Sequence, residues 1–139
     1  MKRIVALLLS IVTLCAFVSC TGKANTVVTV ESIVNKFSEK QYHVQNYNAE
    51  EIAFVAGNFS AANLELNGEI STVVHIIDSN LSTPQFEFVY VYEFTDKTDA
   101  EAFAENRMAY VETLDGGNCV LFGSIVIFGN SPLIAEIGK

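Results

Sequence analysis

The stretch Phe86-Glu87-Phe88-Val89-Tyr90-Val91-Tyr92-Glu93-Phe94 is the most strand-prone part of this chain and decides how the rest folds. Successive side chains of a β-strand point to opposite faces of the sheet. One face of this strand therefore carries only aromatic residues: Phe86, Phe88, Tyr90, Tyr92 and Phe94. The other face carries two valines and two glutamates. Because both faces hold apolar side chains, we expect a sheet that must be covered on both sides.

Two arrangements of this strand are open. If the aromatic residues meet the helices, they are core residues, and the open face carries the valines with Glu87 and Glu93 at its rim. If the valines meet the helices, an aromatic platform faces outward and would suit a ligand or a partner. A central strand usually buries its larger side chains, which favours the first arrangement.

The candidate interaction face is whichever side of this strand the helices leave uncovered. Its candidate residues are Phe86, Phe88, Tyr90, Tyr92 and Phe94. If the helices do not suffice to cover both sides, the candidate partners are a second copy of the chain, forming a homodimer, or another protein.

Hydrophobic periodicity on either side of this strand predicts an α+β domain. The expected helices are residues 30–40, 49–56, 96–114 and a short one after Ser131-Pro132, and the other expected strands are residues 42–47, 70–77, 119–122 and 125–128. We expect strands 70–77 and 86–94 to pair as an antiparallel hairpin. Gly123-Ser124 suits either a tight hairpin turn or a bulge in one longer strand.

Without its first helix, the expected order is strand, helix, strand, strand, helix, strand. This order is the split βαβ arrangement and resembles that of ferredoxin-like domains. The resemblance implies an antiparallel sheet with helices on one face, extended by an N-terminal helix and a short C-terminal helix.

The amino terminus has the pattern of an export signal. Lys2 and Arg3 precede an apolar run from Ile4 to Val18, which is followed by Ser19 and Cys20. An apolar run of about 15 residues is typical of a secretory signal, since a membrane-spanning helix needs roughly 20.

Phe17-Val18-Ser19-Cys20 resembles the lipobox of bacterial lipoproteins, with Phe at the position where Leu is usual. The resemblance implies a signal peptide over residues 1–19, cleavage before Cys20 and lipidation of that cysteine. Residues 20–28 would then tether a single α+β domain, residues 29–139, to the membrane. Because two or more acyl chains anchor stably, we expect a protein held on the outer side of the cytoplasmic membrane or on the outer membrane.

The charge of the chain argues against nucleic acid as a partner. The sequence has 16 carboxylates and 8 cations, for a formal charge of -8, and loss of Lys2 and Arg3 with the signal peptide would leave -10. Such a surface repels the phosphate backbone, and no basic stripe interrupted by aromatic residues is present.

Few residues suggest catalysis. Cys15 would leave with the signal peptide, and Cys20 would carry the lipid, so the one free cysteine that remains is Cys119. Cys119 could form a thiol dyad or a metal site with His75 or His43. Their spacing matches no metal-ligand pattern, and no phosphate-binding loop or nucleophile elbow occurs. We therefore expect a non-enzymatic binding or protein-interaction domain without cofactor or metal; the alternative is a thiol-dependent or other hydrolase or redox enzyme using Cys119.

Overall fold

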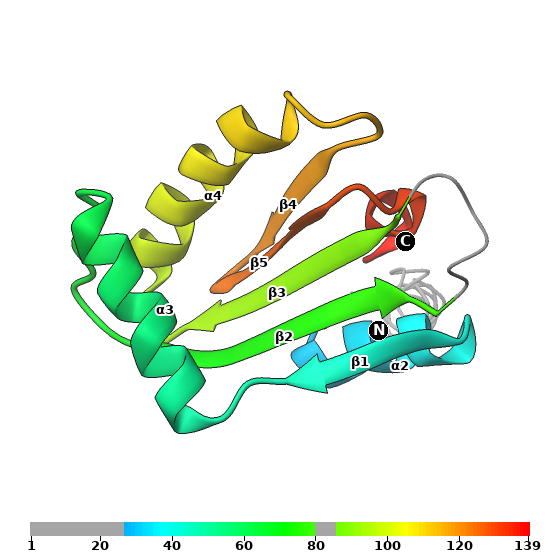
Figure 1. The fold of residues 1–139 in the computed structure, drawn as a ribbon, viewed down its shortest axis with the longest axis horizontal. Coiled ribbons are helices and arrows are strands. Elements are labelled where there is room, and N and C mark those ends of the chain that lie inside the picture. The colour runs from blue at the N-terminus through cyan, green and yellow to red at the C-terminus, as the bar shows by residue number, and fades with distance from the viewer. Residues whose placement is uncertain (1–26, 80–85) are drawn as a thin grey trace, which may run out of the picture.

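A computed structural model describes residues 27–79 and 86–139, so the predicted signal peptide, Cys20 and most of the predicted tether lie outside the described residues. The described part is an α+β structure built on one five-stranded antiparallel sheet (Figure 1). Its elements are α2 (Val30–Glu39), β1 (Tyr42–Asn46), α3 (Ala49–Ala61), β2 (Ile70–Asp78), β3 (Phe88–Phe94), α4 (Lys97–Val111), β4 (Asn118–Phe122), β5 (Ile125–Gly129) and the short 3-10 helix η2 (Pro132–Glu136).

The order of strands across the sheet is β1-β2-β3-β5-β4, and every neighbouring pair is antiparallel. The predicted hairpin of β2 and β3 is confirmed. The ferredoxin-like arrangement is wrong, because in a split βαβ unit the two strands that flank the helix are parallel and not adjacent. Here β1 and β2 flank α3 and pair directly, with Gln45 opposite His75.

Burial explains where the last two strands lie in the sheet. All five residues of β5 are buried, whereas those of β4 are half-buried. The more apolar strand β5 therefore occupies the inner position beside β3, and β4 forms the edge. The two strands are joined by Gly123 and Ser124 as a tight hairpin rather than a bulge, and Gly123 has the positive φ of +61° that such turns require.

Helices cover both faces of the sheet, and the expectation of helices on one face is wrong. Helices α3 and α4 lie on the near face in Figure 1, where α4 packs on β4 and β5, while α2 and η2 lie on the far face. The physical reason is the two-sided apolar character of the central strands. Val89 and Val91 of β3 point to the far face and are fully buried against its cluster.

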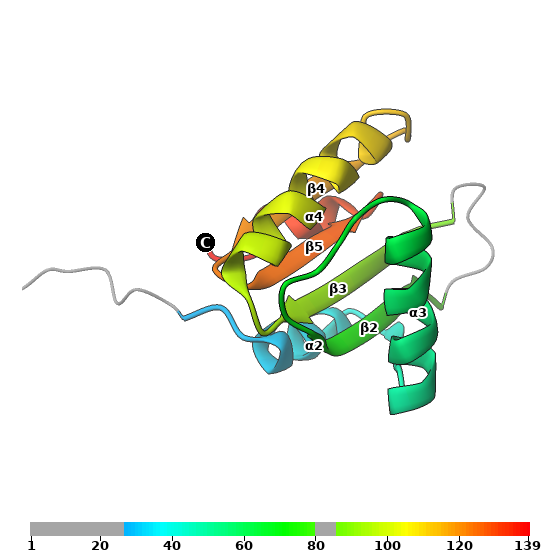
Figure 2. The same cartoon turned by 90° about the vertical axis from the view of Figure 1, so that its left-hand side faces the viewer.

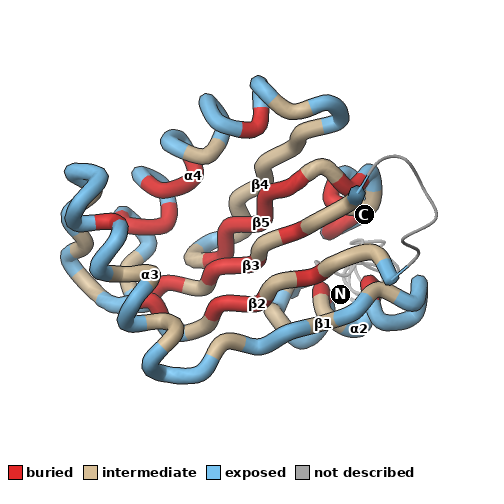
Figure 3. Tube along the Cα trace, in the orientation of Figure 1, coloured by how far each residue is buried: buried red, intermediate tan, exposed pale blue. Residues whose placement is uncertain are grey.

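The near-face core is a cluster of aromatic rings centred on Phe103 of α4. Its ring centre lies 4.8 Å from those of Phe59 and Tyr92, 5.3 Å from that of Phe94 and 5.9 Å from that of Phe128. Such ring pairs add roughly 0.5–1.5 kcal/mol each beyond the burial of their area. Figure 3 shows how burial concentrates in the central strands β2, β3 and β5.

Helix α3 is longer than predicted. It begins after the Asn48 cap, whose side chain accepts hydrogen bonds from the backbone N–H groups of Glu50 and Glu51. It then continues through Gly57 to Ala61 instead of ending near Gly57. The packing of Phe59 against the Phe103 cluster outweighs the cost of a glycine inside a helix.

Replacing Gly57 tests this account of α3. A Cβ atom at Gly57 would meet no atom within 4 Å, so Gly57→Ala should raise the free energy of unfolding by about 0.5–1 kcal/mol, measured by urea denaturation. The control is Gly129→Ala, where the new Cβ would lie 2.0 Å from the Phe88 carbonyl oxygen and should destabilise the protein. A neutral or destabilising Gly57→Ala would show that α3 is not a regular helix at this position.

Candidate functional site

The aromatic side of β3 is divided between core and surface. Tyr92 and Phe94 are only 7% and 2% exposed, because they lie beneath α3 and α4 in the Phe103 cluster. These two candidate residues therefore cannot contact a partner. Phe88 and Tyr90, farther from that end of the strand, are half-buried, and Phe86, just before β3, is 53% exposed.

The arrangement of the helices causes this division. Helix α3 crosses the near face at the end where β2 begins and β3 ends, whereas α4 runs over β4 and β5 (Figures 1 and 2). On the near face, no helix of the described residues overlies the opposite ends of β2 and β3. The side chains that point to the near face there remain partly exposed.

His75 and Tyr90 form the centre of this open surface. They are opposite each other on β2 and β3, and their rings stack with centres 4.2 Å apart and planes 2° from parallel. The Tyr90 ring also stacks on Phe128 at 5.5 Å and lies 6.0 Å from Phe88. Burial lowers the pKa of His75, so this imidazole is mostly neutral at pH 7.

Two further tyrosines lie near Tyr90, and an arginine lies over one of them. Burial raises the pKa of Tyr90, and the neighbouring hydroxyls of Tyr47 and Tyr110 raise it further. The Arg107 guanidinium lies over aromatic rings, 5.2 Å from the centre of Phe103 and 5.6 Å from that of Tyr110. We call His75, Phe88, Tyr90, Tyr47 and Tyr110 the aromatic face.

This composition is that of a contact surface. Tyrosine and arginine are enriched where proteins bind partners, because each offers a large apolar area together with a hydrogen-bonding group. Arg107 makes no ion pair within the described residues and donates instead to the side-chain oxygen of Asn106 at 2.7 Å. The sequence pattern identified Phe88 and Tyr90, but no local signal indicated Tyr47, Tyr110 or Arg107, which other elements bring to the same place.

The structure does not bring the predicted catalytic residues together. Cys119 lies on β4 and His75 on β2, with β3 and β5 between them. Three strand spacings amount to about 14 Å, which excludes a thiol–imidazole hydrogen bond in this arrangement. His43 lies on the edge strand β1, still farther from Cys119. Among the described residues, no group of three or more His, Cys, Asp or Glu side chains could hold a metal ion.

The Cys119 thiol also lacks the environment of a reactive cysteine. Burial raises its pKa to about 11, although the charge of Arg107 acts in the opposite direction. The Sγ atom lies 3.7 Å from the Ala104 carbonyl oxygen of α4. A thiol of this kind is rarely deprotonated near neutral pH.

Thiol labelling tests this assignment. Compared with an ordinary thiol of pKa 9.0, a pKa of about 11 lowers the thiolate population below pH 9 about 100-fold. We expect labelling of Cys119 in the folded chain to be at least that slow, to keep rising between pH 9 and 11, and to become fast in denaturant. Mass spectrometry with Cys119→Ser as control separates its signal from those of Cys15 and Cys20. Rapid labelling of the folded chain at pH 7 would restore the enzyme hypothesis.

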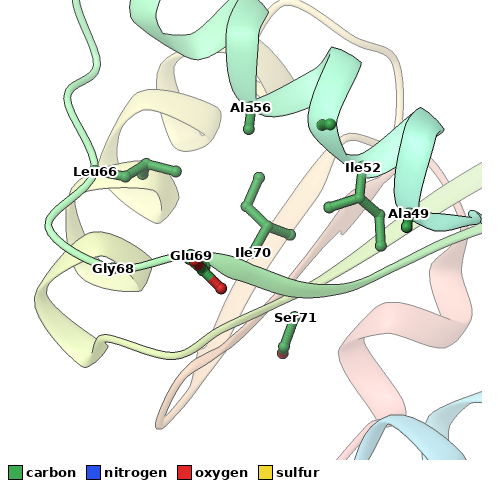
Figure 4. Close-up of a pocket in the computed structure, with 9 residues that line it drawn as sticks. Ala49, Ile52, Ala56, Leu66, Gly68, Glu69, Ile70 and Ser71 are labelled. Atoms are coloured by element: carbon green, nitrogen blue, oxygen red, sulfur yellow. The ribbon is translucent and has the colours of Figure 1, made fainter.

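One cavity lies beneath α3, between this helix and the start of β2 (Figure 4). Its volume is about 500 Å³, and its walls are mostly alanine, isoleucine and leucine side chains. Glu69 is its one charged lining residue. The hydroxyl of its lining residue Ser71 donates to the Glu93 carbonyl oxygen at 3.0 Å, and no histidine lines the cavity to activate that hydroxyl. The cavity therefore offers no serine–histidine pair for catalysis, and its walls suit an apolar group.

A second groove opens where β1 meets α3. Its volume is about 450 Å³, and we call it the β1–α3 groove; its lining residues are Gln45, Tyr47, Glu50, Glu51, Phe54 and Val55. Phe54 is 72% exposed, which is unusual for a phenylalanine. Tyr47 belongs both to this groove and to the aromatic face, so the two surfaces are continuous.

Comparison with known proteins found no match to this chain among protein-family models, curated proteins or solved structures. Within residues 27–79 and 86–139, no helix is long and apolar enough to cross a membrane.

Proposed function

We propose that this protein is a membrane-anchored lipoprotein whose folded domain binds another macromolecule and is not an enzyme. The proposed anchor is a lipid on Cys20, and the proposed contact surface is the aromatic face. The observation that carries the proposal is the stack of His75 on Tyr90, a pair of rings on the near face of the sheet that are both partly exposed.

The physical argument rests on the difference between the two ends of β3. Where α3 and α4 cover the sheet, Tyr92 and Phe94 stabilise the fold by burial. Where the helices do not cover the sheet, the side chains of Phe88 and Tyr90 expose apolar surface to water, and a bound partner could bury this surface. The candidate occupants of this face are an envelope protein and a second copy of the chain.

A lysine on the aromatic face should prevent association. Tyr90→Lys and Phe88→Lys each place a charge where a partner would bury apolar surface, so binding or self-association should fall at least tenfold, measured by analytical ultracentrifugation in detergent and by crosslinking in membranes. The matched control is Val27→Lys, which changes an exposed apolar residue on the segment before α2. Unchanged sedimentation and crosslinking in both lysine variants, with the fold intact by circular dichroism, would refute the proposed surface.

The anchor makes a separate prediction. Cys20→Ala removes the proposed lipid site, so the protein should leave the membrane fraction or accumulate as an uncleaved precursor, detected by fractionation and mass spectrometry. Cys119→Ala is the matched control and should not change the membrane association. A cleaved Cys20→Ala protein that stays in the membrane fraction would contradict the lipoprotein assignment.

A further inference from the structure

Strand β1 is an edge of the sheet, and the hydrogen-bond pattern shows which of its backbone groups point outward. The Tyr47 N–H donates to the Val73 carbonyl oxygen at 3.0 Å, so these two residues form a hydrogen-bonded pair. Such pairs alternate along an antiparallel ladder. Gln45 therefore bonds to β2, whereas the N–H and C=O groups of Val44 and Asn46 point away from the sheet.

This edge lacks the features with which proteins usually prevent further strand pairing. Natural edge strands carry lysine, proline or a bulge that blocks another strand. Residues Tyr42–Asn46 contain neither lysine nor proline, and their register with β2 is continuous. Of these protective features, β1 has only its short length, which limits the number of hydrogen bonds that a further strand could form with it.

The β1–α3 groove lies at the end of this edge and favours a positive charge. Its walls combine the rings of Tyr47 and Phe54 with the carboxylates of Glu50 and Glu51. A lysine or arginine side chain is attracted both by aromatic faces and by carboxylates. Glu51 also accepts a hydrogen bond from the Asn48 N–H at 2.7 Å, which leaves Glu50 as the more available carboxylate.

The two elements that form the groove bring no cation of their own. From Tyr42 to Ala61 the chain contains no lysine or arginine, and the formal charge of the whole chain is -8. A second copy of the chain would bring the same charge to this edge and would be repelled. Charge complementarity therefore favours a basic partner.

We infer that the β1 edge binds an extended, basic segment of a partner polypeptide. The segment adds as a sixth strand by hydrogen bonding to Val44 and Asn46, and it places a lysine or arginine side chain in the β1–α3 groove. This inference rests on the proposed binding function, because it names the chemical class of the partner.

Peptide binding tests the inference without knowledge of the natural partner. The probe is a fluorescent peptide of alternating valine and lysine, and the control peptide has glutamate in place of lysine. Fluorescence anisotropy with the full chain in detergent should show that only the basic peptide binds and that its affinity falls as salt is added. Equal binding of the acidic peptide would overturn the inference of a basic partner.

Two matched pairs of variants separate strand addition from general attraction. Asn46→Pro removes the outward N–H and leaves the β1–β2 hydrogen bonds, whereas Asn46→Ala keeps that N–H. Of these two variants, we expect only Asn46→Pro to lower the affinity for the peptide, by about tenfold. Glu50→Lys should weaken binding at least as much, while Glu112→Lys, at the exposed end of α4, makes the same charge change and should have a smaller effect.

Equal affinity of the Asn46→Pro and Asn46→Ala variants, with the fold intact, would overturn strand addition. Self-association that Asn46→Pro abolishes would make a second copy the occupant of the edge and would also overturn the inference. If no peptide binds although Tyr90→Lys still disrupts association, the β1 edge is not the site, and the proposed function stands without it.

Discussion

The structure depends on a central strand, β3, that is apolar on both faces. Such a strand is stable only in a sheet that is covered on both sides, and a chain of this size has few helices for that purpose. The far face is closed by α2 and η2 over Val89 and Val91, which are fully buried. The near face is closed by α3 and α4 at the end where Tyr92 and Phe94 are buried, whereas Phe88 and Tyr90 of the aromatic face remain partly exposed.

The residues along the aromatic side of β3 match this uneven cover. Phe94, at the covered end, has no polar atom in its side chain and needs none in the Phe103 cluster. Tyr92 is buried beside it, and burial strongly raises the pKa of its hydroxyl. Tyr90, at the boundary, keeps its hydroxyl near those of Tyr47 and Tyr110. A tyrosine is suited to such a boundary because its ring is apolar and its hydroxyl can remain hydrated.

The helices and strands could be predicted from the sequence because caps and hydrophobic periodicity lie within each segment. The aromatic face could not be predicted in full, because residues far apart in the sequence form it. The caps Thr29 and Asn48 mark the starts of α2 and α3 within one turn of chain. The end of α3 was missed because Phe59 is held by tertiary packing. The alternation within β3 placed its four aromatic rings on one face, but the stack of His75 on Tyr90 requires the register of β2 against β3, which the alternation within a single strand does not fix.

The two proposed surfaces and the proposed anchor are arranged consistently. Val28 and Val30 pack with the far-face cluster, so the described chain begins on the side of the sheet opposite the aromatic face. Val27 lies seven positions after Cys20, and a fully extended segment of that length would reach at most about 25 Å. A lipid on Cys20 would therefore hold the domain close to the bilayer with its far side nearer the tether. The aromatic face, on the other side of the sheet, would then be open to partners in the surrounding compartment.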